Sequence, residues 1–300
     1  MSAGDHALYA GVELGGTHTV CGVGRADGTL LHRSRTPTLD PEATLAEIGA
    51  TLADYGRRFG RPRALGVAAF GPVRLDPMAR DYGVIGPTPK TAWRGVDLLA
   101  ELGARFDGPV DLQTDVIGAA IGESTWGAGV GCDPFVYLTV GTGIGAGILV
   151  RGRPLTGLLH PEIGHVRAPR APGDAYPGAC VFHRDCLEGL ASGPSIVARW
   201  GARLEDLGPG HAAYEIIGHY LSHLVADTVL CVAPRRIVLG GGVMTNPDLF
   251  PAIRGGVRAL LAGYLDVEEL REGIDEFIVP PVLGSDAGVL GAIAMAAGRV

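Results

Sequence analysis

The sequence predicts an α/β fold made of two similar halves, and two observations support this. Short apolar runs alternate along the chain with longer segments of helical periodicity, which is typical of α/β proteins. The same local order also occurs twice. An apolar run, a glycine-threonine turn, a second apolar run and a second glycine turn begin at Leu8 and again at Phe135, roughly 125 residues later. Such repetition predicts an internal duplication.

The first half is expected to begin with a meander of three strands, because its apolar runs are separated by Gly15-Gly16-Thr17 and by Asp27-Gly28. Apolar residues then recur at helical spacing from Leu45 to Tyr55. The strands of this half are expected over 8–14, 18–24, 29–34, 64–69 and 110–113. Its helices are expected over 42–60, 96–106 and 117–127.

The second half repeats the opening meander around Gly141-Thr142-Gly143 and ends in a helix of small residues. Its strands are expected over 135–140, 144–150, 236–239 and 277–283. Its helices are expected over 212–233, 248–263 and 287–297.

Composition excludes several classes of function. The chain has 300 residues, 47% of them hydrophobic, so it can bury a large core. A net charge of −7 argues against binding a nucleic-acid backbone. Lys90 is the only lysine, which excludes a P-loop of the Gly-Lys-Thr type and disfavours a Schiff-base lysine.

The cysteines and the N-terminal segment predict a cytoplasmic protein. The five cysteines lack the regular spacing of a secreted disulfide framework. The first residues, Met1 to His6, show no basic segment followed by an apolar one, so no signal peptide is expected. No apolar run is long enough to cross a bilayer.

A metal site is predicted from four closely spaced residues, His165, Cys180, His183 and Cys186. Two sulfur and two imidazole ligands can close a tetrahedral zinc site and leave no position for water, as in a structural site. Glu162 and Glu188 lie among these ligands and are not needed by the metal, so they are candidates for holding a polar substrate. The alternative is that the cysteines are buried apolar residues and the histidines lie at the surface.

Three glycine-rich turns follow apolar strands and are candidate phosphate sites. Glycine leaves backbone N–H groups open to approach, and such concave turns bind phosphate. The turns are Gly15-Gly16-Thr17, Gly141-Thr142-Gly143 and Gly240-Gly241-Gly242. Any single turn could use glycine for backbone reasons alone. Their matched places in a duplicated layout favour a nucleotide site that uses backbone amides and Mg²⁺.

Two carboxylates are candidates for the chemistry. Asp115 follows an apolar strand and precedes a helix, so it could cap that helix or accept a proton as a general base. Glu13 lies inside an apolar strand, where a buried carboxylate needs a partner such as Mg²⁺ or water bound to it.

Together these motifs resemble the ROK family, a group of bacterial sugar kinases and sugar-responsive repressors with the actin-like ATPase fold. The segments Gly11-Val-Glu-Leu-Gly-Gly-Thr17 and Leu138-Thr-Val-Gly-Thr-Gly-Ile-Gly145 resemble the family's two phosphate loops. The segment Ile237-Val-Leu-Gly-Gly-Gly-Val-Met244 resembles its adenosine segment. Glu162-Ile-Gly-His165 and Cys186-Leu-Glu188 resemble its sugar and zinc elements.

The resemblance implies a two-domain, ribonuclease H-like architecture with an active-site cleft between the domains. It implies an N-terminal α/β domain over 1–114, closed by a C-terminal helix at 285–300. The second domain, over 115–284, is expected to carry the zinc-binding sugar loop. It also implies a homodimer that binds a sugar, ATP, Mg²⁺ and Zn²⁺, with neither a nucleic-acid partner nor a membrane.

The resemblance also implies roles for individual residues. Asp115 aligns with the general base. The substrate-binding residues are expected to be Gly71, Pro72, Thr114, Glu162, His165 and Glu188. The nucleotide and Mg²⁺ are expected at Glu13, Gly15, Gly16, Thr17, His18, Gly141, Thr142, Gly143, Gly240, Gly241 and Gly242. The zinc ligands are expected to be His165, Cys180, His183 and Cys186, with the second ring nitrogen of His165 directed at the sugar.

The fructokinase branch is favoured over the glucokinase branch. The chain has Glu13 where glucokinases of the family usually have Asp, and Cys-x-x-His-x-x-Cys in place of their cysteine-richer zinc segment. Phe70-Gly-Pro-Val-Arg-Leu and Thr88-Pro-Lys-Thr-Ala-Trp93 also resemble fructokinases. Two departures are His18, where the family often has Lys, and Ile117, where it often has Asn.

Three alternatives remain. The sugar could be glucose, mannose or an N-acetylhexosamine. A repressor of the family would carry a DNA-binding segment before the first phosphate loop, but ten residues precede Gly11 and the net charge is negative. A non-catalytic sugar sensor could keep the fold, although the presence of Asp115 argues against it.

Overall fold

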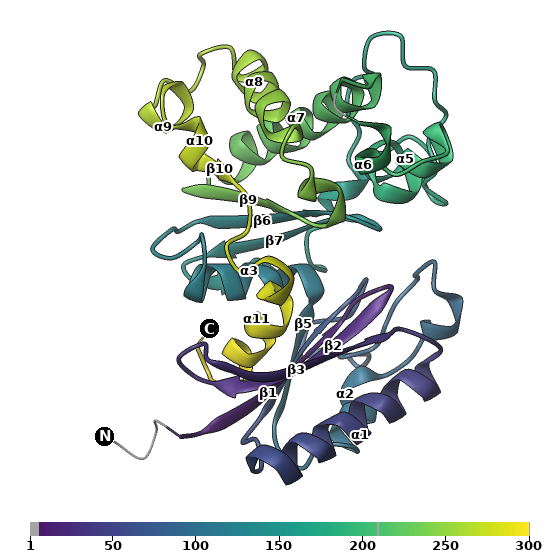
Figure 1. The fold of residues 1–300 in the computed structure, drawn as a ribbon, viewed down its shortest axis with the longest axis vertical. Helices are drawn as coiled ribbons and strands as arrows, with labels where there is room; N and C mark the ends of the chain where they lie inside the picture. Colours follow the sequence, from purple (N-terminus) through teal and green to yellow (C-terminus); the bar gives the residue numbers. More distant parts are fainter. Residues whose placement is uncertain (1–5, 209, 300) are drawn as a thin grey trace. The chain divides into compact units, whose positions relative to one another are not determined.

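The computed structural model describes residues 6–208 and 210–299. It divides into two compact units. Unit 1 comprises the chain up to Val130, Gly152–His160 and the chain from Val282, and unit 2 comprises Gly131–Arg151 and Pro161–Pro281. Each unit is built on its own sheet with helices packed against it (Figure 1). The predicted α/β class is confirmed. Met1 to Asp5, on which the signal-peptide prediction rests, lie outside the described residues, as does Val300.

The sheet of unit 1 has the order β3-β2-β1-β4-β5. Strands β1, β2 and β3 form an antiparallel meander, and β4 and β5 run parallel to β1. The bounds are β1 (Leu8–Leu14), β2 (His18–Arg25), β3 (Leu30–Pro37), β4 (Leu65–Ala69) and β5 (Val110–Thr114). The meander and both parallel strands lie within a residue or so of the predicted ranges, except that β3 extends further towards Pro37.

The two faces of this sheet are covered by different helices. Alternation along β1 directs Val12 and Leu14 into an apolar core shared with the helices α1 (Pro41–Phe59) and α2 (Leu98–Gly103). Asp40 caps α1 through its side chain, which accepts a hydrogen bond from the N–H of Ala43. Gly11 and Glu13 therefore lie on the opposite face, where the helices α3 and α11 pack (Figure 1).

Helices α3 (Asp115–Trp126) and α11 (Ala287–Ala296) pack at backbone distance. A Cβ added at Gly291 would lie 1.7 Å from the carbonyl oxygen of Gly118, and one at Gly66 of β4 would lie 1.8 Å from that of Ala292. Because α3 packs into this glycine-lined contact, it belongs to unit 1. The unit boundary after Val130 therefore differs from the predicted domain boundary after Thr114. The predicted C-terminal helix at 285–300 is shorter, since a 3₁₀ turn (η4, Gly284–Asp286) precedes α11.

Glu123 of α3 ties two distant chain segments to this helix pair. Its side chain is fully buried. The carboxylate accepts hydrogen bonds from the N–H groups of Ala128 (2.7 Å), Val282 (3.2 Å) and Leu283 (2.8 Å). Three N–H donors are a strong set for a buried carboxylate. This network explains why the chain from Val282 belongs to unit 1.

In unit 2 the strands β10-β9-β6-β7 lie side by side in that order, which repeats the order β5-β4-β1-β2 of unit 1. The hairpin of β6 and β7 is antiparallel, and β9 and β10 run parallel to β6. The bounds are β6 (Phe135–Val140), β7 (Ile144–Val150), β9 (Arg236–Gly240) and β10 (Ile278–Val279). The predicted strand over 277–283 is largely wrong, because Pro280 and Pro281 cannot donate to a strand ladder.

The core of unit 2 lies between its sheet and the helices α7 (Ala212–Val232) and α8 (Leu249–Leu261). Val136, Leu138 and Val140 of β6 alternate towards this core, and both helices lie on the same side of the sheet in Figure 1. Within the described ranges, none of the helices is long and apolar enough to span a membrane.

Several short elements were not predicted. They are α4 (Leu187–Ala191), α5 (Gly193–Trp200), α6 (Leu204–Leu207), α9 (Glu268–Arg271), α10 (Ile274–Phe277), η1 (Thr91–Trp93), η2 (Ile163–His165) and η3 (Gly242–Thr245). The third strand of the repeated meander, predicted after Gly152, is only two residues long, β8 (Arg153–Pro154).

Candidate functional site

Strand β5 and helix α3 place Asp115 at the end of the unit 1 sheet. Thr114 caps α3, because its hydroxyl oxygen accepts a hydrogen bond from the N–H of Ile117 at 3.3 Å. The side chain of Asp115 accepts a hydrogen bond from the N–H of the adjacent residue Val116, at 2.8 Å. Thr114 therefore supplies the helix cap, and the carboxylate of Asp115 is left for another role.

Asp115 and Glu13 are half-buried residues of unit 1 whose carboxylates interact with each other. Burial raises the pKa of Asp115 from 3.8 to about 6, opposed by the backbone hydrogen bond from Val116. Burial also raises the pKa of Glu13 from 4.5 to about 7, and the negative charges of Asp115 and Asp286 add to this rise while Arg35 opposes it. A carboxylate whose pKa lies near 6 can take a proton from a hydroxyl group at neutral pH.

The first glycine turn connects β1 to β2. The N–H of Gly15 donates to the carbonyl of His18 at 3.0 Å, and the hydroxyl of Thr38 donates to the carbonyl of Gly15 at 2.8 Å. His18, which replaces the family's Lys, has its Nδ1 atom 3.0 Å from a guanidinium nitrogen of Arg35. Hydrogen bonds from Gly15 to His18 and from Thr38 to Gly15 therefore stabilise the turn between β1 and β2.

Gly71 and Pro72 lie directly after β4, next to the imidazole of His160. The N–H of Val73 donates to Nε2 of His160 at 3.4 Å. A Cβ added at Gly71 would lie 3.2 Å from the same ring. His160 is buried. It was not predicted as a site residue, although it lies two residues before the predicted substrate-binding residue Glu162.

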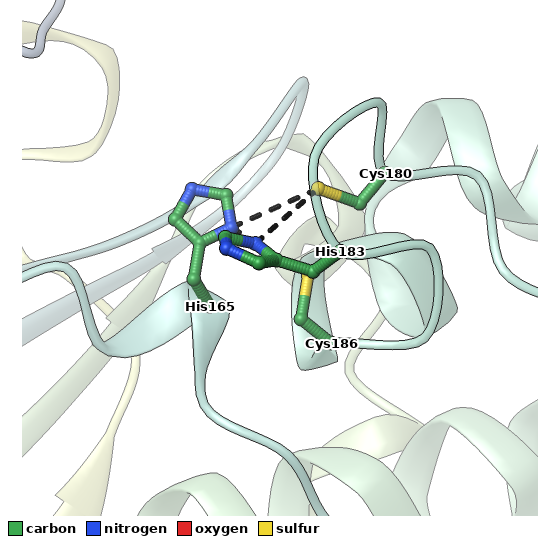
Figure 2. A group of neighbouring side chains, drawn as sticks. All are labelled: His165, Cys180, His183 and Cys186. Atoms are coloured by element: carbon green, nitrogen blue, oxygen red, sulfur yellow. Dashed lines mark hydrogen bonds between the residues drawn. The ribbon is translucent and has the colours of Figure 1, made fainter.

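The four predicted metal ligands converge in unit 2 (Figure 2). Their ligand atoms all lie within 4.8 Å of one another. Nδ1 of His165 lies 3.5 Å from Sγ of Cys186 and 3.9 Å from Sγ of Cys180, and Nδ1 of His183 lies 3.8 Å from Sγ of Cys180. Zn–S bonds of about 2.3 Å and Zn–N bonds of about 2.05 Å require roughly 3.6 Å between neighbouring S and N atoms of a tetrahedron. The residues present fit a zinc ion.

The two carboxylates among these ligands have different surroundings. Oε2 of Glu162, an exposed residue, lies 4.0 Å from Nε2 of His165. The ring of His165 thus directs Nδ1 at the ligand cluster and Nε2 at the glutamate. Oε2 of Glu188 instead accepts the N–H of Ile144 at 3.0 Å. A Cβ at Gly143 would lie 2.7 Å from this oxygen, so Glu188 lies against the second glycine turn.

The second and third glycine segments lie next to each other in unit 2. A Cβ added at Gly141 would lie 3.6 Å from the N atom of Gly242. Gly241 has a φ of +92°, and a Cβ there would lie 2.5 Å from the carbonyl oxygen of Val140. The N–H of Gly193, the first residue of α5, donates to the carbonyl of Gly141 at 2.8 Å. The pairing of β6 with β9 therefore brings the two segments together.

Each unit thus assembles its own part of the predicted site. Unit 1 holds Glu13, Gly15, Gly16, Thr17, His18, Gly71, Pro72, Thr114 and Asp115. Unit 2 holds Gly141, Thr142, Gly143, Glu162, His165, Cys180, His183, Cys186, Glu188, Gly240, Gly241 and Gly242. Asp286 and Lys90 were not predicted to contribute, although both are in unit 1.

Comparison with known proteins places these residues in a family. The family model described as ROK family matches residues 9–299. A relative from Bacillus subtilis is 43% identical over 96% of this chain and 95% of its own. A protein from Zymomonas mobilis named fructokinase is 38% identical over 97% of both chains. The structure of a glucokinase from Streptomyces griseus with glucose and AMPPNP has a TM-score of 0.75 at 26% identity, covering 97% of this chain and all (100%) of that one.

Proposed function

The chain belongs to the ROK family, and from this premise we propose that it is a fructokinase, which transfers the γ-phosphoryl group of ATP to O6 of D-fructose. The proposal is carried by the carboxylate of Asp115. Its pKa is raised to about 6, and it is free for chemistry because Thr114, and not Asp115, caps helix α3. Fructose is supported by relatives named fructokinase that are 34–38% identical over at least 96% of this chain.

In the proposed reaction Asp115 takes the proton of the 6-hydroxyl group. The hydroxyl oxygen then forms a bond to the γ-phosphorus, the bond from that phosphorus to the β,γ-bridging oxygen breaks, and ADP leaves. The transfer itself needs mainly positioning and charge stabilisation. Asp115 contributes to the positioning, because its carboxylate orients the hydroxyl group whose proton it accepts, and with a pKa of about 6 it is still mostly ionised at neutral pH.

The glycine turns are proposed to hold the nucleotide. Gly15, Gly16, Thr17 and His18 of unit 1 and the glycine segments 141–143 and 240–242 of unit 2 are assigned to this role. Glu13 fits a Mg²⁺ ion bound through water, because it is a buried carboxylate beside a second one and its charge needs compensation. Mg²⁺ would neutralise charge on the phosphates.

A structural zinc ion is proposed at His165, Cys180, His183 and Cys186. These four ligands would fill all positions of a tetrahedral ion, so a bound ion would organise the loops and would have no open position for chemistry. His165 would be fixed through Nδ1 and would present Nε2 beside Glu162, which suits both residues to holding sugar hydroxyls. Glu188 is assigned to the sugar as well, through the oxygen that does not accept Ile144. Gly71, Pro72 and Thr114 of unit 1 are also assigned to substrate binding.

The test is turnover across a panel of sugars. ADP release from Mg-ATP is measured with fructose, mannose, glucose, N-acetylglucosamine and N-acetylmannosamine, and the product on fructose is checked for phosphate at C6. We expect the highest kcat/KM on fructose. A higher value on another sugar would assign the same mechanism to that sugar, and no turnover on any would favour a sensor. A homodimer, which the resemblance implies, stays a prediction that sedimentation can test.

A further inference from the structure

The side chain of Lys90 lies beside the first glycine turn. Its Cε atom would be 3.7 Å from a Cβ placed on Gly16, and it is the nearest atom to that position other than the turn's own neighbours. Gly16 itself has no side chain, so the side chain of Lys90 lies next to the space that a side chain at this position would occupy. Lys90 lies far from Gly16 in sequence, and only the folded chain brings them together.

The backbone around Lys90 is anchored at several points. The N–H of Lys90 donates to the hydroxyl of Thr88 at 3.4 Å, and the Nε–H of Arg94 donates to the carbonyl of Thr88 at 2.7 Å. The fully buried Trp93 donates its indole N–H to the carbonyl of Leu39 at 3.0 Å. These contacts fix the backbone of the segment that carries Lys90, so the fold itself places the side chain of Lys90 beside the turn.

The ammonium group has no counter-charge of its own. Among the residues that the structure describes, Lys90 forms no ion pair, and it is half-buried. The other cation near the turn, Arg35, is engaged by His18. A lone lysine that is held beside a glycine turn and lacks a carboxylate partner has the character of a phosphate-binding group, because an ammonium binds phosphate as a point charge.

We propose that Lys90 is a catalytic residue that binds the terminal phosphates of the nucleotide at the Gly15–Thr17 turn. It would stabilise the charge that moves onto the phosphates during transfer. The inference rests on the proposed kinase function and deepens it. It also explains how position 18 can hold histidine in place of lysine, since the positive charge comes from a different part of the same unit.

The first test is a set of substitutions at Lys90 that are expected to leave the fold unchanged. Lys90→Met keeps the length of the side chain and removes its charge, and Lys90→Arg keeps the charge. The control is Arg80→Met, which makes the same charge change at an exposed residue in the same connection between β4 and β5. We expect kcat/KM for ATP to fall about 100-fold or more in Lys90→Met, with a partial recovery in Lys90→Arg. Arg80→Met should remain within twofold of wild type.

A second test reads the same contact without turnover. Because the chain has a single lysine, its acetylation by a water-soluble N-hydroxysuccinimide ester can be followed by mass of one peptide. We expect Mg-AMPPNP to slow acetylation of Lys90 at least about fivefold, in keeping with a directly bound phosphate, and fructose alone to leave it unchanged. Protection by fructose alone would overturn the assignment to the nucleotide, as would no protection by either ligand.

The two tests separate this inference from the proposed function. If the wild type phosphorylates none of the sugars and Mg-AMPPNP still protects Lys90, the proposed function fails and the phosphate site stands. If the wild type is an active kinase and Lys90→Met keeps its kcat/KM for ATP within threefold, the inference about Lys90 is wrong while the proposed function stands.

Discussion

The two units share a strand order but differ in where their polar groups lie, on the sheet in unit 1 and on loops in unit 2. In unit 1 the order β2-β1-β4-β5 carries two carboxylates, Glu13 and Asp115, that are buried and have raised pKa values. In unit 2 the same order, β7-β6-β9-β10, carries a cluster of cysteine and histidine on the loops beyond its strands. Of the two glutamates among these ligands, Glu162 is exposed and Glu188 accepts a hydrogen bond from the N–H of Ile144.

The difference comes from what packs on the sheet. In unit 1 the face that carries Glu13 is lined by glycine, and a Cβ added at Gly11 would lie 2.6 Å from the carbonyl oxygen of Val289 in α11. A Cβ at Gly288 would lie 2.4 Å from the carboxyl carbon of Glu13. The backbone of α11 thus excludes water from the carboxylate, and the charged form loses solvation. In unit 2 the strand β6 directs Val136 and Leu138 into an apolar core, and the polar chemistry lies in loops that need another organising element, for which zinc is proposed.

The largest expected effect is at the buried base. Asp115→Asn keeps the shape of the side chain and removes its ability to accept a proton, so kcat on fructose should fall about 10²- to 10⁴-fold. Binding of Mg-AMPPNP should stay within a few-fold, and α3 should remain intact because Thr114 caps it. Steady-state kinetics and calorimetric titration measure these values. The control is Asp111→Asn, the same change at an exposed position of β5, the strand that leads into α3. Turnover of Asp115→Asn within a few-fold of wild type would rule out its role as base.

A smaller effect is expected when the unit 2 cluster is broken. Cys186 is fully buried and its sulfur lies 3.5 Å from Nδ1 of His165. Cys186→Ser should therefore remove bound zinc and lower kcat/KM for fructose about 10- to 100-fold, since the ligands organise the loops that carry Glu162. Metal analysis of the purified protein gives the zinc content. Cys231→Ser, at an exposed cysteine outside the cluster, is the matched control. A wild-type protein that contains no zinc and is fully active after chelation would contradict the proposal.

The sequence predicts contacts within a short stretch better than contacts across the fold. The ligands His165 to Cys186 could be predicted because they lie close in sequence and their residue types select a metal. The carboxyl end of β5 was sufficient to single out Asp115. The partner of Glu188 could not be predicted, because it is the N–H of Ile144 in a different element. The approach of Lys90 to Gly16 depends on the packing of Trp93 under the 88–94 segment. The glycine contacts that place α3 in unit 1 involve backbone atoms, which no pattern of side chains reveals.

The smallest effect concerns stability and tests why unit 1 buries a carboxylate at all. The pKa of Glu13 is raised from 4.5 in an exposed chain to about 7 in the fold, so the folded protein binds the proton more tightly than the unfolded chain. The stability that this proton provides is complete below about pH 4.5 and is lost as the pH rises towards 7. Glu13→Gln resembles the protonated form at every pH. At pH 8 the free energy of unfolding of Glu13→Gln should therefore be roughly 3 kcal/mol larger than that of the wild type. At pH 4.5 the two values should be nearly equal.

Urea unfolding of both proteins at pH 4.5, 6 and 8 measures this difference. The control is Glu42→Gln, which makes the same change at an exposed position. We expect the Glu42→Gln curve to follow wild type at all three pH values. If Glu13→Gln gains no stability at pH 8, the carboxylate of Glu13 is compensated in the native protein by a neighbour such as Arg35, and the contrast between the two units reduces to their metal chemistry. If it gains stability but loses turnover, the buried charge is kept for function at the expense of the fold.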